Sequence, residues 1–189
     1  MERRYRALAI YVLLLAGVAS AWLVRDLQKV ASFPAFWIVF LCVAGCLFVF
    51  QFGMRAPRIG LISMERVPQI ALLLTLGTPV AATICAIASL VWPLVNRDYS
   101  QRSIPFALLR GLHNAAMTAL MLMAAGQVYA MLGGQQPLLA LAVVQIVPLV
   151  AMALAIQVVN IALMALFFRF DGRDVRRIVT PQYALADLL

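Results

Sequence analysis

Five long apolar runs, separated by charged or turn-forming residues, constrain this chain more than any other feature of its sequence. They cover residues 7–24, 33–54, 67–95, 105–134 and 137–168. A transmembrane helix needs about 20 mostly apolar residues, and continuous runs favour helices over the alternating strands of a membrane barrel. Only 12% of the 189 residues are charged, whereas soluble domains carry ~25%. The sequence therefore predicts an all-α, polytopic integral membrane protein.

The third run raises a question of topology, because it is long for one helix and short for two. Residues 67–95 would form a single helix of about 43 Å, against a hydrocarbon core of about 30 Å. Gly77, Thr78 and Pro79 interrupt this run. Glycine allows a turn, and proline disfavours helix at the residue before it. A turn at this point gives six spans, with short third and fourth spans on either side of it.

The distribution of positive charge favours the turn, because cytoplasmic segments of membrane proteins are enriched in Lys and Arg. With a cytoplasmic N-terminus and a turn at 77–79, twelve arginines fall inside and only Arg25 and Lys29 fall outside. The twelve are Arg3, Arg4, Arg6, Arg55, Arg58, Arg66, Arg97, Arg102, Arg169, Arg173, Arg176 and Arg177. Without the turn, the tally becomes six inside and eight outside. We therefore expect six transmembrane helices with both termini cytoplasmic, in a bacterial inner membrane.

These spans divide the chain into a transmembrane domain, residues 1–168, and a basic cytoplasmic tail or linker, residues 169–189. In the last run, Pro148 is expected to kink the helix. The tail becomes apolar again at 184–189, so we expect the chain to be part of a longer protein.

An alternative concerns the first span, where three early arginines, an apolar stretch and small residues at 19–21 have the layout of a cleavable signal peptide. Cleavage would leave five spans. The apolar run continues to Val24, which favours an uncleaved span.

The residue types that carry most enzyme chemistry are scarce within the predicted spans. All seven acidic residues lie at the ends of spans or between them, and His113 is the single histidine. Cys42, Cys46 and Cys85 lie in apolar runs, where free cysteine behaves as a small hydrophobe. The sequence has no glycine-rich phosphate loop. We expect no enzyme activity, no metal and no cofactor, and the positive charge follows from membrane topology rather than from nucleic-acid binding.

Polar residues do recur within the fifth and sixth predicted spans. They are Arg110, His113, Asn114 and Thr118 in the fifth span, and Gln157 and Asn160 in the sixth. Spacings of three or four residues put each set on one helix face. Asn114 and Asn160 also lie at similar depth, roughly 12–14 Å from the cytoplasmic ends of their helices. Two interpretations remain open: polar contacts that hold two helices together, or a pocket for a small ligand.

Several short motifs resemble those of a known family. The Gly77-Thr78-Pro79 turn, the RGLHNAA stretch at 110–116, the GQVYAMLGG stretch at 126–134 and the Val159-Asn160 pair are the residues concerned. They resemble the multi-span membrane input domains that precede GGDEF, HD-GYP or PAS output modules in bacterial signalling proteins. The resemblance covers roughly residues 60–170. It implies a sensory module that relays a signal to a cytoplasmic output domain or partner protein.

The helix–turn–helix layout is also similar to the substrate-binding subunits of energy-coupling-factor vitamin transporters, which implies the alternative function of a small-molecule transporter subunit. An output domain encoded after Leu189 in the same reading frame would favour signalling, and a neighbouring transporter ATPase would favour transport. The partners we expect are the lipid bilayer, a cytoplasmic output domain or partner protein, a small-molecule ligand and a second copy of the chain. We expect no nucleic acid among them.

Overall fold

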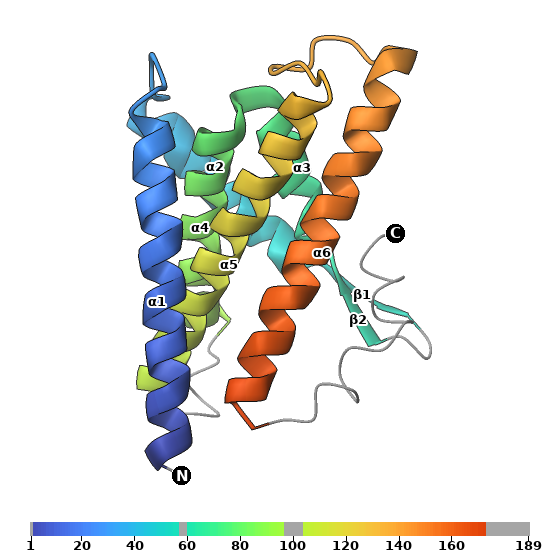
Figure 1. The fold of residues 1–189 in the computed structure, drawn as a ribbon. Helices are drawn as coiled ribbons and strands as arrows, with labels where there is room; N and C mark the ends of the chain where they lie inside the picture. Colours follow the sequence, from blue (N-terminus) through green and yellow to red (C-terminus); the bar gives the residue numbers. More distant parts are fainter. Residues whose placement is uncertain (1, 57–59, 97–103, 173–189) are drawn as a thin grey trace.

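The computed structural model describes residues 2–56, 60–96 and 104–172. Within these residues the chain forms helices joined by short connections and one hairpin. The elements are α1 (Glu2–Leu27), α2 (Phe36–Phe50), β1 (Gly53–Ala56), β2 (Gly60–Ser63), α3 (Arg66–Leu76), α4 (Thr78–Val95), α5 (Ile104–Met131), the short 3₁₀ turn Val143–Gln145 and α6 (Ile146–Phe170). Figure 1 shows that consecutive helices run alternately up and down, so that the N-terminal end of α1 and the C-terminal end of α6 lie at the same end of the bundle.

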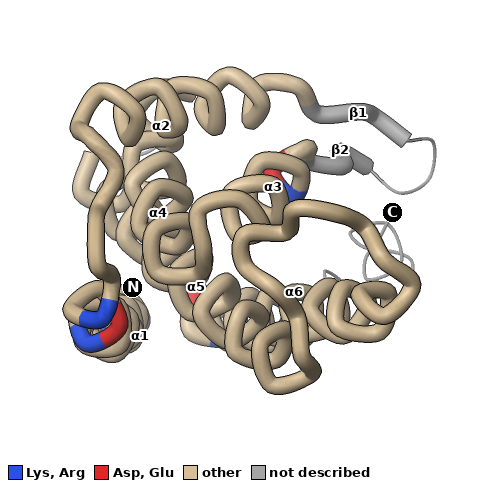
Figure 2. The backbone as a smooth tube through the Cα atoms, turned by 90° about the horizontal axis from the view of Figure 1, so that it is seen from above, with Lys and Arg blue, Asp and Glu red and all other residues tan. Residues whose placement is uncertain are grey.

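Helix α5 is the centre of the bundle and contacts α4, α6 and α1. Of its most apolar stretch, 56% is buried inside the protein, against 17% for α1 and 22% for α6. Seen from above, α5 lies between α1 and α6 (Figure 2). The outer faces of α1 and α6 carry exposed leucine and valine side chains, among them Leu13, Leu14, Val150 and Val158. Such faces suit a lipid environment, because hydrocarbon imposes no cost on exposed apolar groups.

Four of these helices are long and apolar enough to cross a membrane. They are α1 over Tyr5–Leu27, α4, α5, and the stretch Val143–Phe170 that contains α6. Helices α2 and α3 are apolar but shorter, with 15 and 11 residues. The helical, membrane-type architecture expected from composition is therefore present, with four helices of spanning length and two that are shorter.

Gly77 separates α3 from α4, so residues 67–95 do not form one continuous helix. Its backbone has φ 83° and ψ 161°, a region that essentially only glycine occupies. The Gly77 carbonyl then accepts the Ala81 N–H at 3.0 Å in the first turn of α4. Pro79 lies in this same turn, where its missing N–H costs nothing. Figure 1 shows the chain reversing direction between α3 and α4.

The connection between α5 and α6 crosses the ends of α3 and α4. The Leu138 N–H donates to the Leu74 carbonyl at 2.8 Å, which attaches the connection to the C-terminal end of α3. The hydroxyl of the buried Tyr129 lies 3.0 Å from Gln145 Oε1 and 3.2 Å from the Gln135 carbonyl oxygen, and these two acceptors share its single proton. These bonds join the end of α5, the connection and the start of α6.

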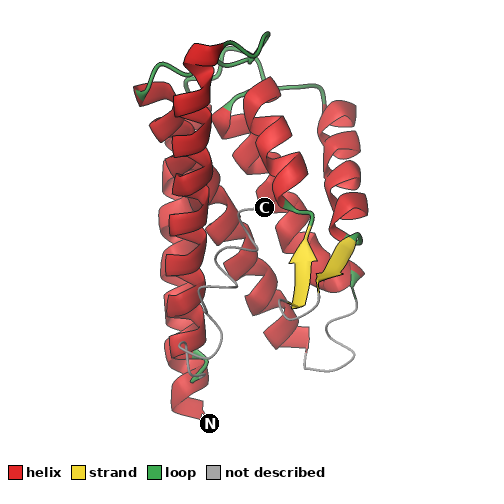
Figure 3. Cartoon of the chain, turned by 90° about the vertical axis from the view of Figure 1, so that its right-hand side faces the viewer, coloured by secondary structure: helices red, strands yellow, loops and turns green. Residues whose placement is uncertain are grey.

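The connection before α3 adds an element that the sequence did not predict. It is an antiparallel hairpin in which Gly53 pairs with Ser63 and Ala56 with Gly60, within an otherwise all-α fold (Figure 3). Unpaired backbone groups next to lipid are costly, and a hairpin pairs some of them.

The structure corrects the expectation about Pro148. This residue does not kink the last helix, because α6 begins at Ile146 and Pro148 lies in its first turn, where proline is tolerated. Most of the predicted tail, residues 173–189, lies outside the described residues.

Candidate ligand cavity

Close contact between α4 and α5 forms one side of the candidate site. A Cβ at Gly111 would lie 2.7 Å from the Leu90 carbonyl oxygen, so only glycine fits at this point of the interface. Toward the other end, the Thr78 side chain lies directly over Gly126. Small residues permit such close approach between membrane helices. The two helices therefore form a tightly packed antiparallel pair.

A cavity of about 190 Å³ lies beside this pair, between α3, α4, α5 and α6. It is lined by Phe50, Glu65, Arg66, Ser89, Trp92, Asn114, Met117, Thr118, Asn160 and Met164. On its wall the hydroxyls of Ser89 and Thr118 are 3.1 Å apart and share a hydrogen bond across the α4–α5 interface. Asn160 is 3% exposed and Asn114 is half-buried. The two asparagines thus line one cavity from neighbouring helices.

Charged residues from the start of α3 reach the same cavity. Glu65 and Arg66 both line it. Arg66 Nη1 donates to Gln69 Oε1 at 3.0 Å and contacts Met121 Sδ at 2.8 Å. Gln69 and Met121 are both almost fully buried. The Arg66 side chain therefore points into the bundle.

The other sequence-predicted site residues are not among those lining the cavity. His113 is buried, with its ring centroid 4.2 Å from that of Phe167 on α6 and 5.8 Å from that of Tyr11 on α1. His113 Nε2 has no hydrogen-bond partner among the described residues. Arg110 is exposed and Gln157 is buried. The structure thus brings Asn114 and Asn160 together at the cavity, while His113 lies at the contact of α5 with α1 and α6.

Sequence reasoning missed Glu65, Arg66 and Ser89 as cavity residues. The charge tally treated Arg66 as an ordinary loop arginine, although its spacing of three from Gln69 is the helical signal that would have assigned both to one face. Ser89 stands alone in an apolar run, so the sequence around it does not indicate that it lines a cavity. Only the packing of α4 against α5 gives it a polar neighbour.

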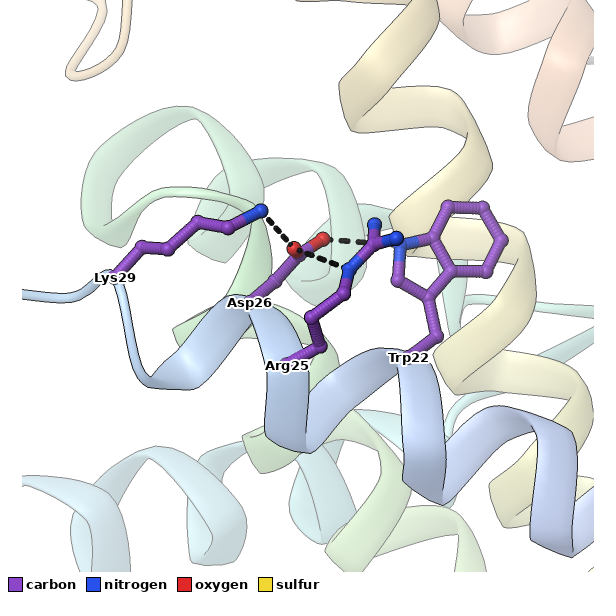
Figure 4. A network of polar contacts seen from close by, with 4 residues as sticks. All are labelled: Trp22, Arg25, Asp26 and Lys29. Carbon is purple, nitrogen blue, oxygen red and sulfur yellow. Dashed lines mark hydrogen bonds and ion pairs between the residues drawn. The ribbon is translucent and has the colours of Figure 1, made fainter.

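The opposite end of the bundle carries an ion-pair cluster on α1. The Asp26 carboxylate accepts hydrogen bonds from Lys29 Nζ at 2.6 Å, Trp22 Nε1 at 2.9 Å and Arg25 Nε at 3.2 Å (Figure 4). The Lys29 and Arg25 side chains are about two-thirds exposed. Such pairs contribute little stability, because water screens them.

A second pocket, of about 310 Å³, adjoins this cluster at the start of α4. Thr78 Oγ1 donates to Gln136 Oε1 at 3.1 Å on its wall. Gln127 and Lys29 also line it. This pocket is more open and more apolar than the first, and it lies on the other side of α5, toward α1. Among the described residues no group of three or more His, Cys, Asp or Glu side chains is placed to hold a metal ion.

Comparisons with protein-family models, with curated proteins and with solved structures give no match to this chain.

Proposed function

We propose that this chain is a membrane-embedded input module that binds a small polar molecule and relays its presence to a cytoplasmic output domain or partner protein. The observation that carries this proposal is the cavity shared by α3, α4, α5 and α6, in which Asn114 and Asn160 lie together with Glu65 and Arg66. Polar and ionisable residues inside a membrane bundle are costly. Several of them converging on one cavity is the arrangement typical of a binding site.

The size of the cavity supports a ligand smaller than a drug. Pockets that enclose drug-sized ligands measure ~300–1,000 Å³, whereas this one measures about 190 Å³. Trp92 and Phe50 supply aromatic surface, and the amides and hydroxyls supply both hydrogen-bond donors and acceptors. These features fit a compact polar molecule of roughly the size of an amino acid.

The relay runs through α6. Asn160 and Met164 of this helix line the cavity, and the helix ends at Phe170, about 15 Å further on. A ligand that hydrogen-bonds Asn160 favours one position of α6 against α5, which moves the end of the helix where the tail begins. A ligand shifts such an equilibrium only by its differential affinity for the two positions.

The proposal includes six crossings of a bacterial inner membrane with both termini in the cytoplasm. The alternating directions of the helices and the twelve-to-two distribution of cationic residues support it. Helices α2 and α3 are each shorter than the hydrocarbon core, so they cross only in the shelter of their neighbours.

The test is ligand binding by the purified chain in lipid nanodiscs. A panel of amino acids, nucleobases and small sugars is screened for compounds that raise the unfolding temperature. We expect a hit whose effect is lost in Asn160→Leu and kept in the control Val158→Leu, a lipid-facing change two residues away. A stabilising compound that acts equally on both variants, or no hit at all, would contradict the proposal. Uptake of the hit into proteoliposomes would favour a transporter subunit instead.

A further inference from the structure

Helix α3 begins well inside the bundle. Its 11 residues rise about 16 Å, and the 18 residues of α4 rise about 27 Å from the same turn at Gly77. Arg66, the first residue of α3, therefore lies about 11 Å short of the end of α4. Ser89, the twelfth residue of α4, lies at about the same depth as Arg66. Arg66 and Ser89 both line the cavity. Figure 3 likewise shows that strands β1 and β2 do not reach the level of the N-terminal end of α1.

This depth is costly for the groups that lie there if lipid surrounds them. A charged side chain deep in the membrane costs at least ~2.5–3.5 kcal/mol, and an open strand edge leaves backbone groups unpaired. Glu65 and Arg66 are both at this level, directly after the two four-residue strands. Non-helical backbone at membrane depth is tolerated only where it is buried in protein or lines a water-filled cavity.

The packing of α3 indicates whether its start is buried in protein or lines a water-filled cavity. Helix α3 packs against α4, α2 and α5. The cavity lies on its remaining side, with Glu65 and Arg66 on one wall and Asn160 and Met164 of α6 on the other. The charged start of α3 thus borders this cavity, while the Arg66 guanidinium also contacts the buried Gln69 and Met121.

We propose that the cavity is the inner end of a water-filled vestibule that opens at the end of the bundle where α1 begins and α6 ends. By the charge distribution this is the cytoplasmic side. The ligand is then a water-soluble molecule taken from the cytoplasm, and not a lipid-soluble one that enters sideways from the bilayer. Since Glu65 and Arg66 have opposite charges, the site suits an uncharged or zwitterionic solute. The ligand class rests on the proposed function; the vestibule does not.

The vestibule is tested by thiol accessibility in the full-length chain. Cys42, Cys46 and Cys85 are first replaced by alanine, and single cysteines are then introduced as Asn160→Cys, Met164→Cys and the lipid-facing control Val158→Cys. The probe is the membrane-impermeant anion sulfonatoethyl methanethiosulfonate. It is added to inverted membrane vesicles, which expose the cytoplasmic side, and to spheroplasts, which expose the other side. Size-exclusion profiles show which variants keep their fold.

We expect cysteines at 160 and 164 to react at least about tenfold faster than the cysteine at 158 in inverted vesicles, because thiolate forms where water is present. In spheroplasts none of the three should react appreciably. Equal slow reaction of folded variants at all three positions, or reaction from the spheroplast side, would overturn the proposal. The outcomes separate the two proposals: fast labelling without any stabilising ligand removes the function and leaves the vestibule.

Discussion

Gly111 is the residue at which α5 packs directly against the backbone of α4, since a Cβ there would meet the backbone oxygen of Leu90 at 2.7 Å. A backbone oxygen cannot move aside as a side chain can. Gly111→Ala should therefore separate the helices and lower the free energy of unfolding by about 1–3 kcal/mol. The measurement is unfolding of the purified protein in mixed micelles by titration with SDS.

The matched control is Gly45→Ala in α2, where an added Cβ meets nothing within 4 Å. Alanine is the better helix former by ~1 kcal/mol, so this variant should be as stable as the wild type or more so. Equal effects of the two substitutions would show that the close approach at Gly111 is not what holds α4 and α5 together.

Among single residues, helical spacing and equal depth predict that Asn114 and Asn160 are neighbours. In the structure both residues are in the lining of one cavity. Spacing assigns residues to faces of one helix, but it does not say which neighbour covers a face. For that reason His113, grouped with them by sequence, lies instead against Phe167 and Tyr11. Arg66 was missed because its depth depends on where α3 starts.

Among the helices, the break at Gly77 depends on a backbone conformation with φ 83° and ψ 161°. A Cβ added there would have only one neighbour, Gln136 Oε1 at 4.0 Å, so an alanine is opposed by backbone strain and not by a clash. Gly77→Ala should cost about 1–3 kcal/mol of unfolding free energy. The same SDS titration checks it, with Gly17→Ala in α1 as the unstrained control. No difference between these variants would show that the break does not need the glycine conformation.

Tyr129 anchors the connection between α5 and α6. Its ring is fully buried, and its hydroxyl bonds Gln145 and Gln135. Tyr129→Phe keeps the ring and removes the hydroxyl donor from the buried Gln145 side chain, which retains only the longer bond from the Gln135 N–H at 3.4 Å. The loss of this hydrogen bond should cost about 0.5–1.5 kcal/mol. Thermal unfolding measures this. Tyr5→Phe, at a 43% exposed position, should change the stability by less than about 0.5 kcal/mol. A Tyr129→Phe variant as stable as that control would mean that the connection is held by other contacts.

The boundaries of the helices and strands show which parts of the fold the sequence did not predict. The apolar runs predicted where the helices lie, because hydrocarbon forces backbone groups to pair within each helix. The runs did not predict the paired strands at 53–56 and 60–63 or the late start of α6 at Ile146. An apolar residue is equally compatible with a helix, a strand or a connection next to lipid, so composition alone cannot separate them.

For the molecule as a whole, we predict that the chain crosses the membrane six times. Alkaline phosphatase fused after Asn96 or Gly172 should be inactive, and green fluorescent protein at the same points should be fluorescent. Alkaline phosphatase fused after Lys29 or Gln135 should be active. The physical reason is the concentration of arginine at the end of the bundle that holds both the start of α1 and the end of α6. Phosphatase activity after Asn96 would restore the interpretation in which residues 67–95 cross only once.

The proposed function depends above all on Asn114 and Asn160 facing each other across a polar cavity inside this bundle. The direct measurement is crosslinking of Asn114→Cys with Asn160→Cys, after alanine replacement of the three native cysteines, using a short bifunctional methanethiosulfonate in native membranes. We predict that the reagent bridges this pair efficiently. The bridge then holds the two fragments together after the chain is cleaved between positions 114 and 160. Little bridging is expected when Val158→Cys, 67% exposed on the outer face of α6, replaces Asn160→Cys. Equal bridging of both pairs, or bridging of the control pair alone, would contradict this arrangement.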